Sequence, residues 1–183
     1  MGCLLNDKQI KELCLEKNMI EPFIDHKVSE GLPSYGLSHA GYDIRIADEF
    51  YVFTPALGAV IDFKNLQKTQ KYYVEIKDDS CIIPPNSYVL AKSVEKFNMP
   101  ENIFATCMNK STCARVGIFA NITPIEPNWK GYLTIEIANL SQVPVKIYAG
   151  MGIAQILFYK IDKPTTVYEG KYQNQNNQIT LAK

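Results

Sequence analysis

Hydrophobic and polar positions divide the chain into a short amphipathic start and a long remainder of alternating residues. Ile10 and Cys14 recur at helical spacing, and the lysines and glutamates between them can face water. Asn6 or Asp7 can cap the start of this segment. We therefore predict a helix from this cap through about Asn18.

Beyond that helix, most apolar residues fall in short runs separated by Gly, Pro, Asn and Asp, which is typical of strands joined by turns. Many short strands with few helical segments predict a mainly β fold, a sandwich or barrel carrying a few helices. The predicted strands are 42–46, 50–53, 72–76, 88–93, 104–108, 132–138, 143–148 and 153–159.

A chain of 183 residues with 46% hydrophobic content can bury one substantial core, so we expect a single domain over 1–183. Within it, about 1–20 forms the N-terminal helical segment and about 170–183 forms a polar, amide-rich tail. By composition, this tail is compatible with an exposed strand, a mobile lid or disorder.

Charge and cysteine content narrow the class of partner and the compartment. Nineteen basic and nineteen acidic residues cancel, so no overall field attracts nucleic acid or an anionic membrane. No apolar run approaches the roughly 20 residues that span a bilayer. Five scattered cysteines, an odd number, fit a reducing cytoplasm better than a disulfide framework.

The stretch CMNKSTCARVG (107–117) concentrates thiols, hydroxyls and basic side chains. Zinc deaminases use a His or Cys followed by Pro-Cys-x-x-Cys, whereas Cys107 and Cys113 lie six residues apart with no histidine nearby. The only histidines, His26 and His39, also leave a Ser or Cys nucleophile without an evident base. We therefore predict packed thiols and no zinc.

Spacing within the same stretch suggests an anion site. If Ser111 to Arg115 begin a short helix, the Ser111 hydroxyl and the Arg115 guanidinium share a face, with Lys110 at the helix start. Such a start can bind phosphate. An exposed polar turn explains the spacing equally well, and spacing alone does not choose between the two.

The strand YLTIEIANL places Leu133, Ile135 and Ile137 on one face and Thr134 and Glu136 on the other. Glutamate is disfavoured in the middle of a strand. Glu136 is therefore either solvent-facing or held in a site.

Several ordered motifs resemble the dCTP deaminase family, relatives of the trimeric dUTPases. The resemblance implies a distorted β-barrel or jelly-roll of the dUTPase-like type, assembled as a homotrimer with active sites between subunits. It also implies zinc-independent hydrolysis of dCTP to dUTP and ammonia, with Mg²⁺ bound through the triphosphate and dTTP as a possible inhibitor. The matching segments are SYGLSHAGYDIR (34–45), KSTCARVG (110–117), NITPIEPNWKGYLTIEI (121–137), GIAQILF (152–158) and GKYQNQ (170–175).

Carried over by motif, Glu136 matches the family's proton donor and acceptor, while Ser111 and Arg115 match the residues that place the water and support charge. The resemblance also implies the remaining nucleotide contacts: phosphate at Lys110, Ser111 and Thr112; base and sugar at the backbone of Thr134 and Ile135; an acidic residue near the sugar at Glu126; closure over the ligand by Gln155, Tyr168 and Gln175; and a further phosphate contact from Lys171.

The sequence departs from the family pattern at Asn109, which replaces a glycine, and at Cys113, where many relatives have Tyr. Two other functions stay open. The AGYDI stretch with Asp43, together with Glu126, is also compatible with dUTP hydrolysis, alone or combined with deamination. A non-catalytic nucleotide-binding trimer is the third alternative.

Overall fold

The structure, a computed structural model, describes residues 3–183, so the first two residues of the predicted N-terminal segment lie outside it. Helix α1 (Asp7–Lys17) confirms the predicted helix. The Asn6 side chain accepts from the backbone N–H of Gln9 at 3.0 Å, and the Gln9 side chain accepts from the backbone N–H of Asn6 at 3.1 Å. These two bonds satisfy backbone donors that have no partner within the helix. Asn18 ends the helix in the left-handed conformation, with φ of 50°.

Strands make up most of the regular secondary structure in the remaining chain, as predicted. The strands are β1 (Cys3–Leu4), β2 (Ile20–Glu21), β3 (Lys27–Val28), β4 (Tyr35–Ser38), β5 (Gly41–Phe53), β6 (Tyr73–Lys77), β7 (Ser80–Ile83), β8 (Ser87–Asn98), β9 (Ile103–Asn109), β10 (Ile118–Asn121), β11 (Lys130–Asn139), β12 (Val145–Tyr148) and β13 (Gly152–Lys160), and two short helices, η1 (Leu66–Tyr72) and α2 (Ser111–Arg115), interrupt them.

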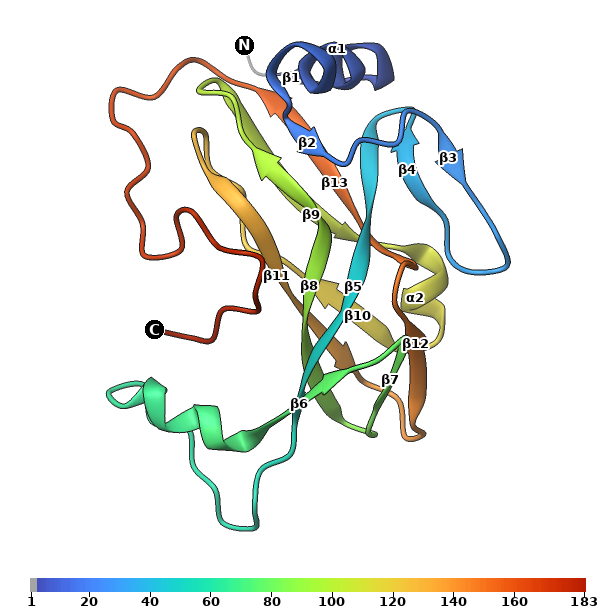
Figure 1. Cartoon of the computed structure of the whole chain (residues 1–183), viewed down its shortest axis with the longest axis vertical. Helices are drawn as coiled ribbons and strands as arrows, with labels where there is room; N and C mark the ends of the chain where they lie inside the picture. Colours follow the sequence, from blue (N-terminus) through green and yellow to red (C-terminus); the bar gives the residue numbers. More distant parts are fainter. Residues whose placement is uncertain (1–2) are drawn as a thin grey trace.

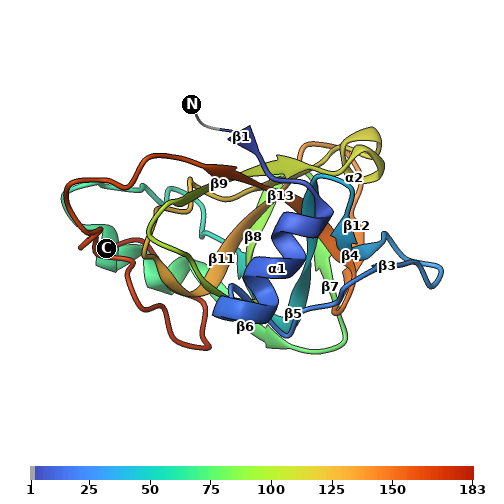
Figure 2. The same cartoon turned by 90° about the horizontal axis from the view of Figure 1, so that it is seen from above.

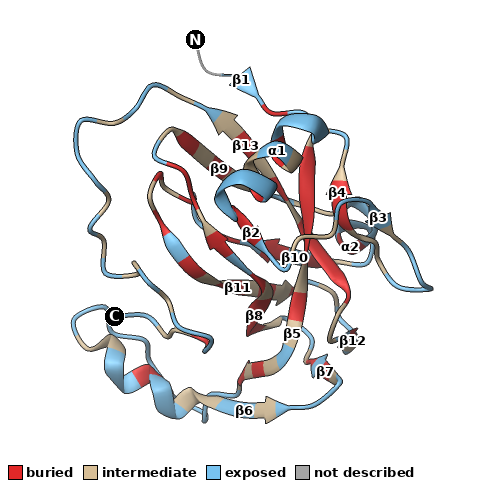
Figure 3. Cartoon of the chain, turned by 45° about the horizontal axis from the view of Figure 1, so that its top comes forward, coloured by how far each residue is buried: buried red, intermediate tan, exposed pale blue. Residues whose placement is uncertain are grey.

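Eleven strands belong to one curled antiparallel sheet whose central order is β1-β13-β5-β8-β11-β10, with β9 on β13 and β6 on β5. Strands β7 and β12 pair separately. The core fills the inside of the curl, where β5, β8, β11 and β13 present their buried residues (Figure 3). Helix α1 lies across one end of this barrel, seen from above in Figure 2, and buries Ile10 and Cys14 against it.

The predicted break between strands 42–46 and 50–53 is wrong, because β5 runs continuously from Gly41 to Phe53. A register irregularity against β8, between Ile46 and Phe50, accommodates the polar residues that suggested a turn. One of them, Glu49, is paired with Lys92 of β8 at 3.3 Å. A partner distant in sequence therefore keeps a polar segment within the sheet.

The chain after β13 leaves the barrel, turns back and passes beside β11 before its last residues turn away from the sheet (Figure 1). Across the described residues, no helix combines the length and the apolar character needed to cross a membrane.

Candidate active site

Strand β11 carries Glu136 on the outer face of the curled sheet. Its burial alternates as predicted, with Leu133, Ile135 and Ile137 in the core and Thr134 and Glu136 on the opposite face. Glu136 lies between Leu90 of β8 and Asn121 of β10 in the strand register. The carboxyl group is therefore in the middle of the sheet rather than at an exposed edge.

A cavity of about 340 Å³ lies over this face. Its floor is formed by β8 and β11, one wall by the loop between β10 and β11, and the opposite wall by the C-terminal tail. Five of the predicted site residues line it: Glu126, Thr134, Glu136, Tyr168 and Gln175. The fold thus brings together residues that are up to 49 positions apart (175 − 126).

The surroundings of Glu136 favour its neutral form. Burial raises the pKa of its carboxyl group from an ordinary 4.5 to about 7. Oε2 is buried and makes no hydrogen bond to any residue in 3–183, and no lysine or arginine is among the cavity residues. Glu136 is consequently poised to gain or lose a proton near neutral pH.

The tail is docked over the cavity, rather than forming an added strand. The Trp129 indole donates to the Tyr172 carbonyl at 2.8 Å, and the Tyr132 amide donates to the Gln175 carbonyl at 3.1 Å. Thr134 Oγ1 donates to Gln175 Oε1 at 3.1 Å and accepts from the Thr180 amide at 3.0 Å. These contacts join the tail to β11 beside Glu136.

The residues predicted to bind phosphate, Lys110, Ser111 and Thr112, do not line this cavity. Of the two conformations left open for this stretch, the short helix is the one that forms: α2 covers Ser111–Arg115 and exposes Ser111, Thr112 and Arg115. Lys110 is mostly buried: its ammonium group is ion-paired with Asp43 and donates to the Ser34 carbonyl at 2.8 Å. The Lys110 charge is therefore partly compensated within the chain.

Strand β10 separates these two groups of predicted residues. Glu136 is opposite Asn121, the last residue of β10, whereas α2 precedes the first, Ile118. Gln155 belongs to the α2 group, because it is in register with Asp43. Within one chain, Arg115 and Glu136 are thus at opposite ends of the strand.

Two further predicted residues do not present side chains to the cavity. Ile135 is fully buried in the core, so only its backbone is available to a ligand. Lys171 lies in the tail, where its ammonium group contacts the carbonyl of Lys183. Lys171 is not among the cavity residues.

The thiols of the 107–117 stretch pack against the protein interior. Cys113 is buried on α2, and Cys107 is half-buried on β9, where burial raises the pKa of its thiol to about 12. Within residues 3–183, no three His, Cys, Asp or Glu side chains gather as a metal-binding group. His26 is a surface residue, 3.0 Å from Asp25.

Several cavity residues were not predicted from the sequence, notably Tyr73, Tyr88, Trp129 and Tyr172. Tyr88 is opposite Ala138 on β11, so the strand alternation that identified Glu136 also places Tyr88 on its face once the pairing is known. Trp129 is the only tryptophan in the chain, and it is buried. The missing information was which strands pair.

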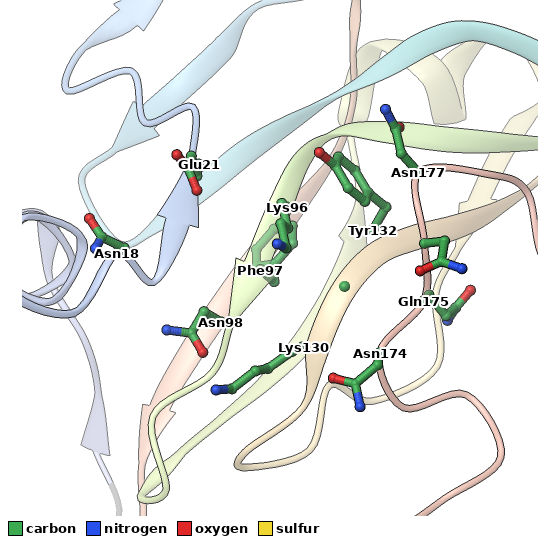
Figure 4. Close-up of a pocket in the computed structure, with 12 residues that line it drawn as sticks. Asn18, Glu21, Lys96, Phe97, Asn98, Lys130, Tyr132, Asn174, Gln175 and Asn177 are labelled. Atoms are coloured by element: carbon green, nitrogen blue, oxygen red, sulfur yellow. The ribbon is translucent and has the colours of Figure 1, made fainter.

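A second hollow of about 570 Å³ lies between α1, the ends of β8 and β11, and the tail (Figure 4). Half of its lining residues carry amide side chains, including Asn98, Asn174 and Asn177, and Lys96 and Lys130 also line it. Gln175 alone of the predicted site residues reaches it. The smaller cavity, which contains Glu136, is therefore the candidate active site.

Comparisons with known proteins identify the family of the chain. A family model described as dCTP deaminase-like matches residues 4–161. The chain is 51% identical to a dCTP deaminase of Herpetosiphon aurantiacus, covering 97% of each chain, and 50% identical to one of Campylobacter concisus, covering 98% of this chain and 97% of the relative.

Among solved structures, a 2′-deoxycytidine 5′-triphosphate deaminase from Agrobacterium tumefaciens superimposes with a TM-score of 0.67 at 18% identity, covering 87% of this chain and 48% of the other. At that identity, the superposition supports the fold.

Proposed function

The chain belongs to the dCTP deaminase-like family, and we propose that it hydrolyses dCTP to dUTP and ammonia with Glu136 as the proton carrier. The observation that carries this proposal is a carboxyl group with a pKa of about 7, in a cavity lined by no lysine or arginine of the described chain. A general acid–base catalyst works best when its pKa lies near the operating pH.

In the proposed reaction, water adds to C4 of cytosine while its proton passes to Glu136, which delivers that proton to N3. The added hydroxyl group then gives its proton, again through Glu136, to the exocyclic amine, which leaves as ammonia. Each proton that Glu136 accepts is returned, so the carboxyl group is regenerated. Ser111 is proposed to place the water, and Arg115 to stabilise developing negative charge.

We propose that Ser111 and Arg115 come from a neighbouring subunit of a homotrimer. The separation of α2 from Glu136 along β10 supports this arrangement, because one chain supplies the carboxyl group without the guanidinium. Exposed apolar side chains near α2, at Met108, Val116 and Phe119, suit a surface that another copy covers.

The other proposed nucleotide contacts come from two places, the α2 side and the cavity side. Lys110 and Thr112 would join Ser111 and Arg115 in holding the triphosphate from the α2 side, where Gln155 would close over the ligand. Glu126, Thr134, the Ile135 backbone, Tyr168 and Gln175 would hold the base and sugar from the cavity side. Lys171 would add a phosphate contact from the tail.

Magnesium is proposed to arrive with the triphosphate, since Mg²⁺ keeps several waters and is usually held by substrate phosphates. Reduced, unpaired cysteines are consistent with the proposed cytoplasmic location. The dependence of ammonia release on added Mg²⁺, and its inhibition by dTTP, are both measured in the same assay.

The Glu136→Gln variant tests the proton carrier. It should bind dCTP with an affinity close to that of the wild type but lose about 10²–10⁴-fold in ammonia release, because the amide cannot exchange protons. Near-normal turnover would refute the assignment of Glu136. Binding is measured by calorimetry and turnover by ammonia release.

A product assay separates the proposed reaction from dUTP hydrolysis. The proximity of Glu126 to the same cavity is the observation that keeps this second function in view. We expect dUTP and ammonia from dCTP; dUMP with diphosphate would indicate a combined activity, and tight dCTP binding without product would indicate a non-catalytic nucleotide-binding trimer.

Mixing two inactive variants tests the shared site. Glu136→Gln and Arg115→Ala subunits, unfolded together and refolded, should recover about a quarter of the wild-type sites if each site joins two neighbours in a trimer. No recovery, with mixed trimers confirmed by mass spectrometry, would show that both residues act within one chain.

A further inference from the structure

Two tyrosines lie beside Glu136 and have no role in the mechanism above. Tyr88 of β8 is opposite Ala138, so it is the diagonal neighbour of Glu136, within reach of a long side chain. Tyr73 of β6 is opposite Phe53 of β5 on the same outer face. Both tyrosines line the cavity that contains Glu136, and β5 lies between their strands and pairs with both of them (Figure 1).

Packing fixes the two rings. The ring of Phe53 is stacked on that of Tyr88, with centroids 4.7 Å apart, and meets that of Tyr73 at 5.5 Å. The two phenolic oxygens are 2.7 Å apart and share a hydrogen bond. The hydroxyl groups are therefore held in place by aromatic contacts and by each other.

A hydrogen-bonded pair of phenols retains one unused proton. One hydroxyl donates to the other, and the accepting hydroxyl still carries its own hydrogen. Across the described chain, the buried Glu136 Oε2 has no hydrogen-bond partner. Burial raises the pKa of Tyr73, with smaller contributions from Tyr88 and then from the Glu136 charge. An unused donor and an unused buried acceptor thus lie in the same cavity.

We propose that the Tyr73–Tyr88 pair is a positioning element for Glu136: its unused phenolic proton is donated to the ionised Oε2, which leaves Oε1 to face the substrate. The inference rests on the proposed function, since it assigns Oε1 to the reacting water. This hydrogen bond favours the ionised form of Glu136, so it lowers the pKa of the carboxyl group and offsets part of the rise that burial causes. No proton is transferred from either phenol, and both tyrosines stay neutral.

The other titratable side chains near Glu136 do not supply the hydrogen bond that the tyrosine pair is proposed to donate. On β8, Lys92 faces Thr134 and is already ion-paired with Glu49 at 3.3 Å. The remaining titratable groups are acids that repel a carboxylate when ionised or phenols carried by the C-terminal tail; they are Cys107, Glu126, Tyr168 and Tyr172.

Phenylalanine substitutions test the pair, because they remove the hydroxyl groups and keep the stacked rings. The measurement is the titration of the Glu136 carboxyl carbon by NMR in ¹³C-glutamate-labelled protein, with the Glu136→Gln variant identifying the signal. In Tyr73→Phe/Tyr88→Phe, the Glu136 pKa should rise by about one unit, as expected for loss of a hydrogen bond to a charged group.

The kinetic readout is a fall of about tenfold in kcat for ammonia release, with KM nearly unchanged. The double variant should be no worse than the more damaging single variant, because each single substitution already breaks the pair. The matched control is Tyr51→Phe, which removes a hydroxyl group from the same sheet face outside the cavity.

An unchanged Glu136 titration in the double variant would overturn the proposal, whatever happens to turnover. If the wild-type protein released no ammonia from dCTP, the proposed function would fail, yet the titration would still decide whether the phenols address Glu136. Near-ultraviolet circular dichroism confirms that each variant keeps its aromatic packing.

Discussion

Glu95 and Glu136 are two glutamates on neighbouring strands, one fully buried and one half-buried, with different surroundings. Glu95 of β8 is fully buried, and Arg45 of β5 holds both of its oxygens, through Nε at 2.8 Å and the backbone amide at 3.0 Å. Glu136 of β11 has no such cation, and one of its oxygens has no partner in residues 3–183. Burial raises the pKa of both carboxyl groups, but Arg45 opposes that rise at Glu95, which suits a structural ion pair, whereas no cation opposes it at Glu136, which suits proton transfer.

Removing the Arg45 cation should have the largest effect on stability. In Arg45→Ala, Glu95 would be left buried without its partner, which we expect to cost about 3–5 kcal/mol of unfolding free energy. Urea denaturation measures the change. Lys11→Ala is the control, because it breaks the exposed Lys11–Asp25 pair of 2.8 Å and should cost only about 0–1 kcal/mol. Equal losses would show that Glu95 does not need Arg45.

Glu136→Gln should raise the free energy of unfolding at alkaline pH, whereas Arg45→Ala lowers it. The pKa of Glu136 is about 7 in the folded state and an ordinary 4.5 in the unfolded state. Below pH 4.5 the carboxyl group is neutral in both states and leaves the free energy of unfolding unchanged, and it lowers that free energy as the pH rises from 4.5 through 7. We expect the variant to gain about 1–3 kcal/mol above that range and nothing below it.

Denaturation at both ends of this pH range measures the gain. The matched change Glu95→Gln should instead lose stability, because it leaves Arg45 without its carboxylate. Loss of stability in both variants would mean that Glu136, like Glu95, has a structural partner.

Wild-type kcat/KM should report the same Glu136 ionisation. As the base that accepts the water proton, Glu136 must start ionised, so activity should rise with pH and reach half its plateau near pH 7. Below that point we expect about a tenfold fall per pH unit. Ammonia release at limiting dCTP measures the profile, and a half-maximal point near 4.5 would show that Glu136 is not desolvated in the working enzyme.

Local patterns in the sequence predicted the elements that carry the site but not their environment. The capping residues of α1 and the alternation of β11 each depend on neighbouring residues, and both predictions were confirmed. The spacing of α2 left a short helix and a polar turn open, and the helix forms. The continuity of β5 depends on Lys92 of β8, and the burial of Lys110 depends on Asp43, 67 positions away (110 − 43). Such distant pairings come from the sheet topology, which local patterns do not specify.

The conformation of the C-terminal tail also depends on residues that are distant in sequence. Its composition left three conformations open, and contacts with Trp129 and Thr134 decide between them in the folded chain. Tyr73 and Tyr88 were missed for a related reason, because nothing close to them in sequence marks the cavity that they share with Glu136.

The smallest predicted effect concerns the enclosure of Glu136 by the tail, a feature that Glu95 does not share. Gly131 of β11 pairs with Gln175 of the tail, and a side chain at Gly131 would come within 2.6 Å of the Gln175 amide nitrogen. Gly131 also has a φ of 141°, which side chains disfavour. In Gly131→Ala the tail should therefore detach from β11, while the distant Arg45–Glu95 pair stays intact.

Detachment of the tail should hydrate Glu136, so the half-maximal point of kcat/KM should move from about pH 7 toward 4.5, and KM for dCTP should rise several-fold, by about 1 kcal/mol of binding. Gly58→Ala is the control, because Gly58 has a φ of 80° and nothing within 4 Å of the added carbon. If Gly131→Ala raised KM but left the pH profile in place, the tail would contribute to binding without desolvating the carboxyl group, and the cavity floor alone would account for the difference between Glu136 and Glu95.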